Sequence, residues 1–247
     1  GGNCGIDDMD AIAELDRMDD DFGLDTIEMG ATIGVAMEAG LAEFGDAEAA
    51  INLLKEVGKG SPLGRIIGSG AAVTGKVFGV ERVPVVKGQA LPAYDPRSVQ
   101  GMGVTYATTT MGADHTAGNL VGAYLEQKLD PLNPEGQVET SRFLQIAMSA
   151  FDTMGQCFMA SVALLSPEGF EAFRKVIDAK AGTTLGPDDF PHVLGIRVLK
   201  AEKEFNRKAG FTAEDDRLPN FFYEEPLPPH NTVFGISDEE IDSTFDF

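Results

Sequence analysis

The stretch IAELDRMDDDFGLDTIEMGATIGVAMEAG, residues 12–40, decides the fold class of this chain. Its first half carries apolar residues at spacings of three and four, namely Ile12, Leu15, Met18 and Phe22. That spacing puts one apolar stripe on a helix, which we expect to begin after a cap at Asp7 and to end near Gly23. A second helix should follow and stop at Gly40. The stretch therefore predicts a helical hairpin.

Helical patterns continue along the chain. A third helix is expected from a cap at Asp46 to a stop at Gly58, followed by an extended crossing segment with a short β-like run at 83–86. Residues 141–165 form a dense apolar helical region that should be buried on most sides. Residues 192–210 predict an amphipathic helix closed by Gly210, with these residues in phase: Val193, Ile196, Leu199 and Phe205.

These patterns predict an all-α, multihelical protein with little or no sheet. We place a domain boundary near Ser98, which gives one helical domain at 1–98 and a second at 99–247. No period of 20 to 50 residues repeats, so a solenoid is excluded.

Composition excludes several classes of partner. The chain has 247 residues, 43% of them hydrophobic, and 40 Asp and Glu against 19 Lys and Arg give a net charge of −21. Such a chain repels a phosphate backbone or an anionic membrane, so nucleic acid and membrane are not expected partners. Its two cysteines lie too far apart for a CxxC site, and no signal peptide is visible, which favours a reducing, cytoplasmic setting.

One turn pattern occurs twice, as DDFGLD at residues 20–25 and as DTMGQC at residues 152–157. A carboxylate beside a glycine turn can accept hydrogen bonds from an amino-bearing ring, and the glycine lets the backbone approach the ligand closely. Two such turns could clamp one ligand from both sides. The alternative for each turn is a solvated helix end in an acidic protein.

Two further residues are candidates for chemistry. Cys157 lies in an apolar segment beside an aspartate turn, where a buried thiolate would need a metal; the alternative is a small buried hydrophobic residue. His115 lies in TTTMGADHTAGN, where small residues leave room around the ring and Asp114 can influence its protonation. It is a candidate proton donor or acceptor, and the alternative is a surface histidine in a glycine-rich loop.

Four ordered blocks resemble the C-terminal part of the aldehyde:ferredoxin oxidoreductase family: residues 3–30, 86–118, 151–157 and 202–227. The resemblance implies that the repeated turns are the paired pterin-binding motifs DxxGLD and DxxGLC of that family. It assigns pterin binding to Asp20, Gly23, Leu24 and Asp25 in the first motif and to Asp152 and Gly155 in the second. In the second motif Gln156 replaces the usual leucine, and Cys157 takes the part of the fourth ligand of a [4Fe-4S] cluster.

For the intact protein the resemblance implies a tungsten- or molybdenum-pterin enzyme that oxidises aldehydes to carboxylic acids. Electrons would pass through the cluster to ferredoxin, and His115 would assist proton transfer or hold substrate oxygen near the metal. A homodimer is also implied. Some members carry a metal-binding ExxH at the dimer contact, but here the match reads ELDR, with Glu14 present and Arg17 in place of the histidine.

The resemblance also implies that the other three cluster cysteines and a β-rich domain lie before residue 1. We therefore expect this chain to be an inactive fragment of the enzyme that binds neither the cluster nor tungstopterin alone. Two alternatives stay open. One is another substrate within the same superfamily, for example an aromatic thioester that is reduced. The other is a non-catalytic acidic helical interaction protein.

Overall fold

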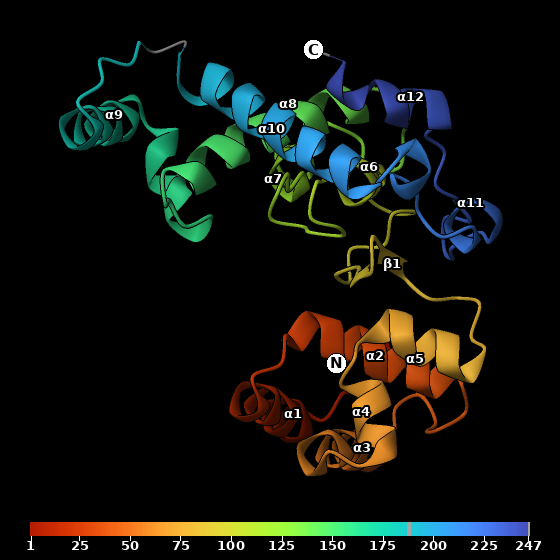
Figure 1. Ribbon diagram of the computed structural model, residues 1–247. Helices are drawn as coiled ribbons and strands as arrows, with labels where there is room; N and C mark the ends of the chain where they lie inside the picture. The colour runs from red at the N-terminus through yellow and green to blue at the C-terminus, as the bar shows by residue number, and fades with distance from the viewer. Residues whose placement is uncertain (187–188, 247) are drawn as a thin grey trace.

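A computed structural model describes residues 1–186 and 189–246, and these form a mostly helical protein, as the sequence predicts (Figure 1). The lower lobe in Figure 1 contains a short 3-10 turn at Gly2–Cys4 followed by five helices. They are α1 (Met9–Phe22), α2 (Thr26–Glu38), α3 (Ala47–Lys59), α4 (Pro62–Ile67) and α5 (Ala71–Phe78). A small hairpin of β1 (Val85–Val86) and β2 (Gln89–Ala90) leads from this lobe to the rest of the chain.

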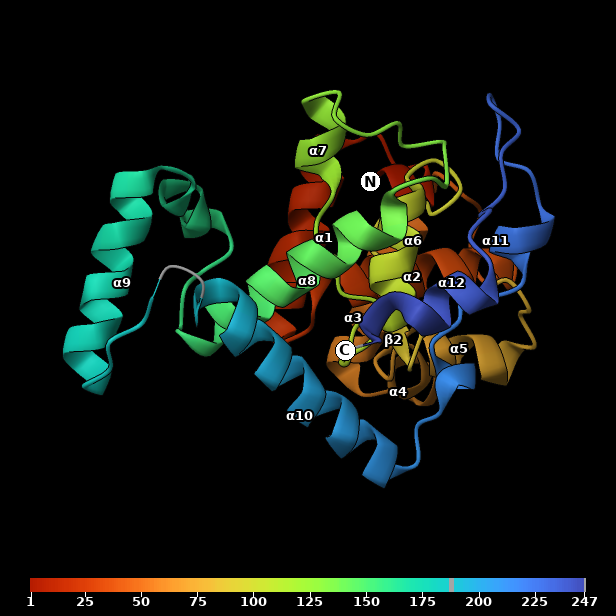
Figure 2. The same cartoon turned by 90° about the horizontal axis from the view of Figure 1, so that it is seen from above.

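The upper lobe holds the remaining helices (Figure 1). They are α6 (Gln100–Thr108), α7 (Val121–Leu125), α8 (Gln137–Thr153), α9 (Pro167–Ala181), α10 (Leu194–Ala209), α11 (Phe221–Glu224) and α12 (Asp238–Asp242). Short 3-10 helices lie at Met159–Leu165, Ala213–Asp215 and Ser243–Phe245, and a short π-helix lies at Asp189–Val193. In both views α9 stands apart from the other helices. α10 packs against α8 and runs at a wide angle to it (Figure 2).

Caps and glycines set the ends of the first helices. The N-cap of α1 is Asp8, not the predicted Asp7, because the Asp8 carboxylate accepts from the backbone amides of residues 10 and 11. Asp46 caps α3 as predicted, but that helix ends at Gly60 and not at Gly58. Gly58 lies inside the helix, where a Cβ atom would come within 2.4 Å of the Phe22 ring. The small residue at 58 therefore serves the contact between α1 and α3.

Strand β1 covers only the second half of the β-like run predicted at 83–86. Val85 pairs with Ala90 and Val86 with Gln89 in an antiparallel register. Glu28 of α2 ties this hairpin to the first lobe, because its carboxylate accepts from the backbone amides of Ala71 at 2.9 Å and Ala90 at 2.8 Å. One side chain thus joins α2, the start of α5 and β2.

The buried apolar residues form three clusters within the described part of the chain. The members of one cluster lie between Cys4 and Ile67 in the sequence, and those of a second lie between Ala31 and Ala90. Both clusters therefore belong to the first lobe and the hairpin. The third runs from Val86 to Ile241 and fills the space around α6, which is buried at every position. The domain boundary near Ser98 stays a prediction.

One prediction for the second lobe is wrong. Residues 141–165 are not one buried helix: α8 ends at Thr153, Gly155 takes a φ of +72°, and the turn that follows leaves Met159 exposed. The amphipathic helix predicted at 192–210 is confirmed as α10, which ends at Gly210. Of the residues predicted to be in phase, Leu199 is buried whereas Val193 and Phe205 are exposed. Sequence periodicity identifies the helix but not which of its faces finds a partner.

Candidate functional site

The two DxxG motifs have the same local structure. In the first, Leu24 donates its backbone N–H to the carbonyl of Asp19 at 2.8 Å; in the second, Gln156 donates to the carbonyl of Phe151 at 2.9 Å. Both bonds close a helix C-terminus around a glycine with positive φ, +70° at residue 23 and +72° at residue 155. The replacement of leucine by Gln156 therefore leaves the shape of the second turn unchanged.

The first motif lies between α1 and α2. Asp25 is the N-cap of α2 and accepts from the amide of Glu28 at 2.7 Å. The side chains of Asp20 and Asp25 are exposed, and Leu24 is half-buried. Their acidic neighbour Asp19 is only 5% exposed, and its Oδ1 atom has no hydrogen-bond partner among the described residues. The first motif thus adjoins a buried acceptor that lacks a donor.

The pKa of Asp19 is raised to about 6. Burial is the main cause, and repulsion from the nearby carboxylates of Asp16, Asp20 and Asp25 adds to it. Asp20 and Asp25, which the resemblance assigns to pterin binding, therefore help to raise the pKa of Asp19 at the C-terminal end of α1. A hydrogen-bond donor placed there would relieve the cost of this arrangement.

The second motif opens onto a cavity of about 380 Å³, which we call the acidic cavity. Its walls come from the loop after α6, from α8 and from α10, and they include Asp114, Gln145, Ser149, Asp152, Leu199 and Glu202. Burial of the carboxyl group raises the pKa of Asp152, and repulsion from Asp114 and Glu202 adds to the shift. Within the described residues, the lining contains three carboxylates and no Lys, Arg or His.

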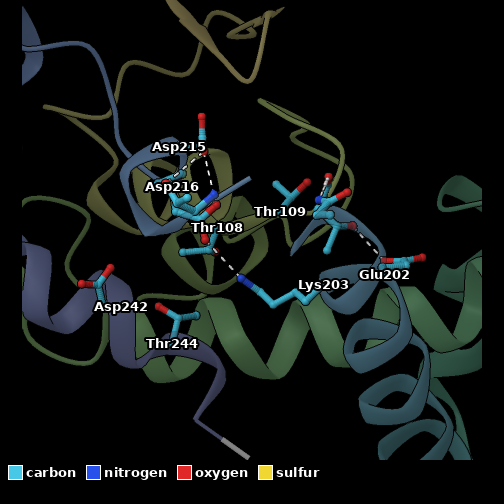
Figure 3. Close-up of polar contacts among 12 residues, drawn as sticks. Thr108, Thr109, Glu202, Lys203, Asp215, Asp216, Asp242 and Thr244 are labelled. Atoms are coloured by element: carbon cyan, nitrogen blue, oxygen red, sulfur yellow. Dashed lines mark hydrogen bonds and ion pairs between the residues drawn. The ribbon is translucent and has the colours of Figure 1, made fainter. Parts of the chain in front are cut away.

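Hydrogen bonds fix the positions of the cavity walls. Thr110 donates its hydroxyl to Glu202 at 2.8 Å, and Asn206 donates to the carbonyl of Thr110 at 2.7 Å, so the loop after α6 is attached to α10. Figure 3 shows Glu202 pointing toward this loop, whereas the neighbouring Lys203 extends toward Asp216. The backbones of α8 and α10 meet at Gly195, where a Cβ atom would lie 1.9 Å from the carbonyl oxygen of Ile146.

His115 follows Asp114 in the same loop but does not line the acidic cavity. Its ring is half-buried and lies against the Tyr94 ring at a centroid distance of 5.8 Å. Asp114 accepts from both the backbone amide and the hydroxyl of Thr116 at 2.8 Å, which fixes the turn that carries His115. The histidine is thus held between an aromatic ring and a rigid turn, and its catalytic role stays a prediction.

The two cysteines differ in environment, and the burial expected for Cys157 is wrong, whereas its role as a cluster ligand stays a prediction. Cys157 is exposed and free, so neither a buried thiolate nor a buried apolar residue describes it. Cys4 is the buried cysteine: its thiol donates to the carbonyl of Gly30 at 3.3 Å, and burial raises the pKa of that thiol. Cys157 is accessible to a ligand bound outside this chain.

No group of three or more His, Cys, Asp or Glu side chains in the described residues is arranged to hold a metal ion. Glu14 of α1 pairs with Lys55 of α3 at 3.9 Å, and Arg17 pairs with Asp21 within α1 at 3.6 Å; all four side chains are exposed. No helix of the described chain is long and apolar enough to cross a membrane.

A second cavity of about 620 Å³ lies next to the first motif, between α2, the segment before α6 and α11. Thr26 and Ile27, which follow Asp25, help to line it, together with Phe221 and Phe222. The two cavities share no lining residue. Convergence of both motifs on one concavity, with His115 on its wall, therefore stays a prediction.

Sequence reasoning missed four residues at these sites: Asp19, Gln145, Ser149 and Glu202. A usable signal was present for most of them. Asp19 is in helical phase with Ile12 and Leu15, on the buried face of α1, and residues 145, 149 and 152 share one face of an otherwise apolar helix. Glu202 gives no such signal, because only the packing of α10 on α8 brings it to the cavity.

Comparisons with known proteins agree with these motifs. The family model for aldehyde ferredoxin oxidoreductase, domains 2 & 3, matches residues 1–243. A tungsten-containing aldehyde ferredoxin oxidoreductase of Pyrococcus horikoshii is 31% identical over 250 residues, which cover 92% of this chain and 40% of the relative. The enzyme of the same name from Pyrococcus furiosus is 30% identical over 248 residues, with the same coverage.

The match over nearly the whole chain defines its class, a helical portion of an oxidoreductase family. The chain belongs to the aldehyde ferredoxin oxidoreductase family and corresponds to domains 2 and 3 of that family. It spans 40% of the length of the curated relatives it matches.

Proposed function

We propose that this chain is the helical part of a tungsten- or molybdenum-pterin oxidoreductase that oxidises aldehydes to carboxylic acids in the cytoplasm. The observation that carries the proposal is the family match over residues 1–243, which includes both DxxG motifs and the GADHTAG loop. The names of the relatives supply tungsten, aldehyde and ferredoxin. The substrate and the electron acceptor are part of the proposal.

The residues beside both motifs fit a pterin. Each motif adjoins a buried oxygen without a hydrogen-bond partner, Oδ1 of Asp19 and Oε1 of Gln145. Carboxylates lie near Asp19, and the lining of the acidic cavity holds three carboxylates and no Lys, Arg or His, so both sites are rich in acceptors. A ring that carries N–H and NH₂ groups supplies the missing donors. We propose that Asp20 and Asp25 bind one such ring and Asp152 another.

When bound, the metal and its pterins supply the two-electron redox chemistry of aldehyde oxidation. The chain's own residues would orient and bury the cofactor, because the glycine turns let backbone approach it and the aspartates accept its N–H groups. His115 would donate or accept a proton at its imidazole nitrogen, or hold the substrate oxygen. The rigid turn at Asp114 and the Tyr94 ring keep that imidazole in place.

The described residues do not by themselves fit a [4Fe-4S] cluster, which needs four cysteine ligands. Cys157 is exposed and free, and Cys4 is buried in another cluster of side chains. We propose that Cys157 supplies one ligand and that the rest lie in the part of the protein that this chain does not span. The chain alone would then bind no cluster and would be inactive.

Ferredoxin, or a similar carrier, is the proposed electron acceptor. Because ferredoxins are generally acidic and this chain carries a net charge of −21, docking on its surface is disfavoured. We propose that the carrier docks on the remaining part of the protein. A homodimer of the intact protein is also proposed, without a bridging metal at Glu14, since Arg17 already pairs with Asp21.

The test uses the intact protein purified with its cofactors. We expect aldehyde oxidation with ferredoxin as acceptor, and a loss of kcat of about 100-fold or more in His115→Asn, in line with the loss of a proton-transfer group. His230→Asn, in an exposed loop, is the matched control and should keep full activity. An intact protein that holds tungsten or molybdenum but oxidises no aldehyde would overturn the proposed reaction.

A further inference from the structure

The cavity of about 620 Å³ between α2 and α11, which we call the apolar cavity, runs from the protein interior to the surface. Its lining includes the buried side chains of Val35, Leu91 and Phe222. It also includes Ile27 and Phe44, which are exposed to solvent. A small molecule can therefore enter from solvent and bury its surface against apolar side chains. The volume lies within the roughly 300–1,000 Å³ that is typical of sites for small organic molecules.

The charged side chains of this lining are paired with carboxylates. Arg82 lies 3.5 Å from Glu38 and 3.0 Å from Glu225. Arg97 donates to Asp95 twice, from Nε at 3.0 Å and from Nη2 at 2.7 Å. Among the lining residues that the structure describes, the two arginines and the carboxylates at positions 38 and 95 are the charged side chains. Their charges sum to zero.

The same two arginines hold an aromatic part of the wall in place. The guanidinium groups of Arg82 and Arg97 lie 5.5 Å and 5.9 Å from the centroid of the Phe221 ring. The ring of Phe222 lies 4.1 Å from that of Phe221. A cation over an aromatic ring is attracted to its face. Both guanidinium groups are therefore engaged by carboxylates and rings, and neither is left as an unpaired cation for a ligand.

This balance of charge decides which molecules the cavity favours. Moving a phosphate or carboxylate group out of water costs free energy unless a cation pairs with it. A neutral apolar molecule avoids that cost and gains from the burial of its surface. The lining therefore favours a neutral, apolar molecule over an anion of the same size.

The apolar cavity adjoins two of the segments that carry candidate residues. The two residues that follow Asp25 of the first motif line it, and so do the two sequence neighbours of Tyr94. The Tyr94 ring lies 5.8 Å from the ring of His115. A molecule in the cavity thus lies beside the first glycine turn and beside the segment that contacts His115.

We propose that the apolar cavity binds the apolar body of an uncharged carbonyl compound, such as an aromatic aldehyde, and discriminates against phosphorylated or carboxylated compounds. The inference rests on the proposed function in one respect, namely that the carbonyl compound is an aldehyde that is oxidised. It adds the class of substrate, a neutral aldehyde with a ring-sized apolar body. The carboxylate product carries a charge that the lining does not pair, so it binds more weakly than the aldehyde.

Gly30 of α2 provides a way to fill the cavity without disturbing the fold. It lines the cavity, and a Cβ atom at this position would meet no heavy atom within 4 Å outside its own helix backbone. Gly30→Leu therefore adds a side chain in open space, and leucine favours a helix more than glycine does. Gly122→Leu in α7 is the matched control, because a Cβ atom there also meets open space and Gly122 lines neither cavity.

The binding test uses 6-propionyl-2-dimethylaminonaphthalene, a neutral ketone whose fluorescence shifts to the blue in apolar surroundings. The 247-residue chain contains no Trp, so the signal comes from the probe. We expect a saturable blue shift with the chain and with the intact protein, reversed by 2-acetonaphthone. The anion 2-naphthoate, with the same rings, should compete about tenfold more weakly. Gly30→Leu should weaken probe binding about tenfold, and Gly122→Leu should bind as the natural chain does.

Steady-state kinetics of the intact protein test the same cavity. Gly30→Leu should raise KM for 2-naphthaldehyde about tenfold and leave kcat unchanged, because the variant removes room for the apolar body and not a group at the reacting atoms. The KM for acetaldehyde should not change, since this aldehyde has only a methyl group to bury. Gly122→Leu should match the natural protein with both aldehydes.

Four results would overturn the inference: no saturable probe binding, equal binding by Gly30→Leu, 2-naphthoate bound as tightly as 2-acetonaphthone, or binding by the chain but not by the intact protein. Failure of the proposed function is distinguishable from these. The expected binding pattern in an intact protein that oxidises no aldehyde would support the cavity and refute the reaction. Oxidation of 2-naphthaldehyde with the same KM in Gly30→Leu and the natural protein would support the reaction and refute the cavity.

Discussion

Lys87 and Asp216 form a buried ion pair that joins the β-hairpin to the turn after α10. The lysine side chain is 3% exposed, and its Nζ atom lies 2.5 Å from Oδ1 of Asp216 and 2.7 Å from the carbonyl oxygen of Ala107. Lys203 reaches the other carboxylate oxygen at 3.1 Å (Figure 3). One carboxylate therefore connects the hairpin with α10, which forms a wall of the acidic cavity.

Lys87→Met should lower the free energy of unfolding by about 3 kcal/mol, because it removes one partner of a buried pair and leaves the backbone carbonyl at Ala107 unpaired. Urea unfolding followed by circular dichroism measures this loss. Lys128→Met is the matched control, since its pair with Glu126 is exposed and should contribute about 0–1 kcal/mol. Equal losses in the two variants would refute the structural role of the Lys87 pair.

Gly195→Ala should destabilise the chain by about 2–3 kcal/mol, because the added methyl would overlap the Ile146 carbonyl and force α8 and α10 apart. The same movement displaces Glu202 from the acidic cavity. Gly122→Ala in α7 meets open space and should be neutral or stabilise by about 0.5–1 kcal/mol. Thermal unfolding of both variants tests the close approach of the two helices, which a neutral Gly195→Ala would exclude.

Asp19→Asn should stabilise the chain at pH 7 and not at pH 4. In the folded chain the pKa of Asp19 is raised from 3.8 to about 6, so the folded state retains its proton more strongly than the unfolded state. In the natural chain the raised pKa stabilises the folded state below about pH 4, and this stabilisation is lost as the pH rises through 6. With a discount for solvent near the carboxyl group, the expected gain from asparagine at pH 7 is about 1–2 kcal/mol.

Unfolding curves at the two pH values, with Asp21→Asn as control, measure this effect. Asp21 is exposed on the same helix and forms only a surface pair with Arg17, so its variant should be nearly neutral at both pH values. A gain for Asp19→Asn that is as large at pH 4 as at pH 7 would contradict the raised pKa.

The local parts of the fold were predictable from sequence. The stripe of α1, the cap at Asp46 and the glycine end at Gly23 depend on neighbouring residues only, and the structure shows all three. Gly58 misled the prediction because its role is a contact with Phe22 from another helix. Periodicity predicted α10 and its end at Gly210, but it does not reveal whether a partner covers the apolar face, and Phe205 is exposed.

The acidic cavity was only partly predictable. Asp152 follows from the repeated motif, and Gln145 could have been found as a polar residue on the same helix face. The wall that α10 contributes depends on the contact between Gly195 and Ile146, which are 49 positions apart in the sequence.

The two cysteines should react at very different rates with a thiol reagent. Cys157 is exposed, whereas Cys4 is buried, donates to the carbonyl of Gly30 and has a raised pKa. We expect DTNB to modify Cys157 of the folded chain at least tenfold faster than Cys4. Cysteine-to-serine variants of each assign the two phases, and rapid modification of Cys4 in the folded chain would contradict its buried position.

The same pair of variants reports on the cluster in the intact protein. Cys157→Ser should lower the iron content, because a hydroxyl group is a much poorer ligand for iron than a thiolate. Cys4→Ser should leave the iron content unchanged, since Cys4 lies outside both motifs. Full iron in Cys157→Ser would exclude this residue as a cluster ligand.

The central claim is that the two matching glycine turns hold the pterin cofactor. The most direct test replaces Asp20 and Asp152 in the intact protein and measures its content of tungsten, molybdenum and pterin. Asp20→Asn combined with Asp152→Asn keeps the size of both side chains and leaves the backbone bonds of the turns in place. We predict that this double variant loses at least nine-tenths of its metal and released pterin. Asp21→Asn, at an exposed position that the DxxG pattern leaves variable, should retain both. Natural metal and pterin content in the folded double variant would contradict the account.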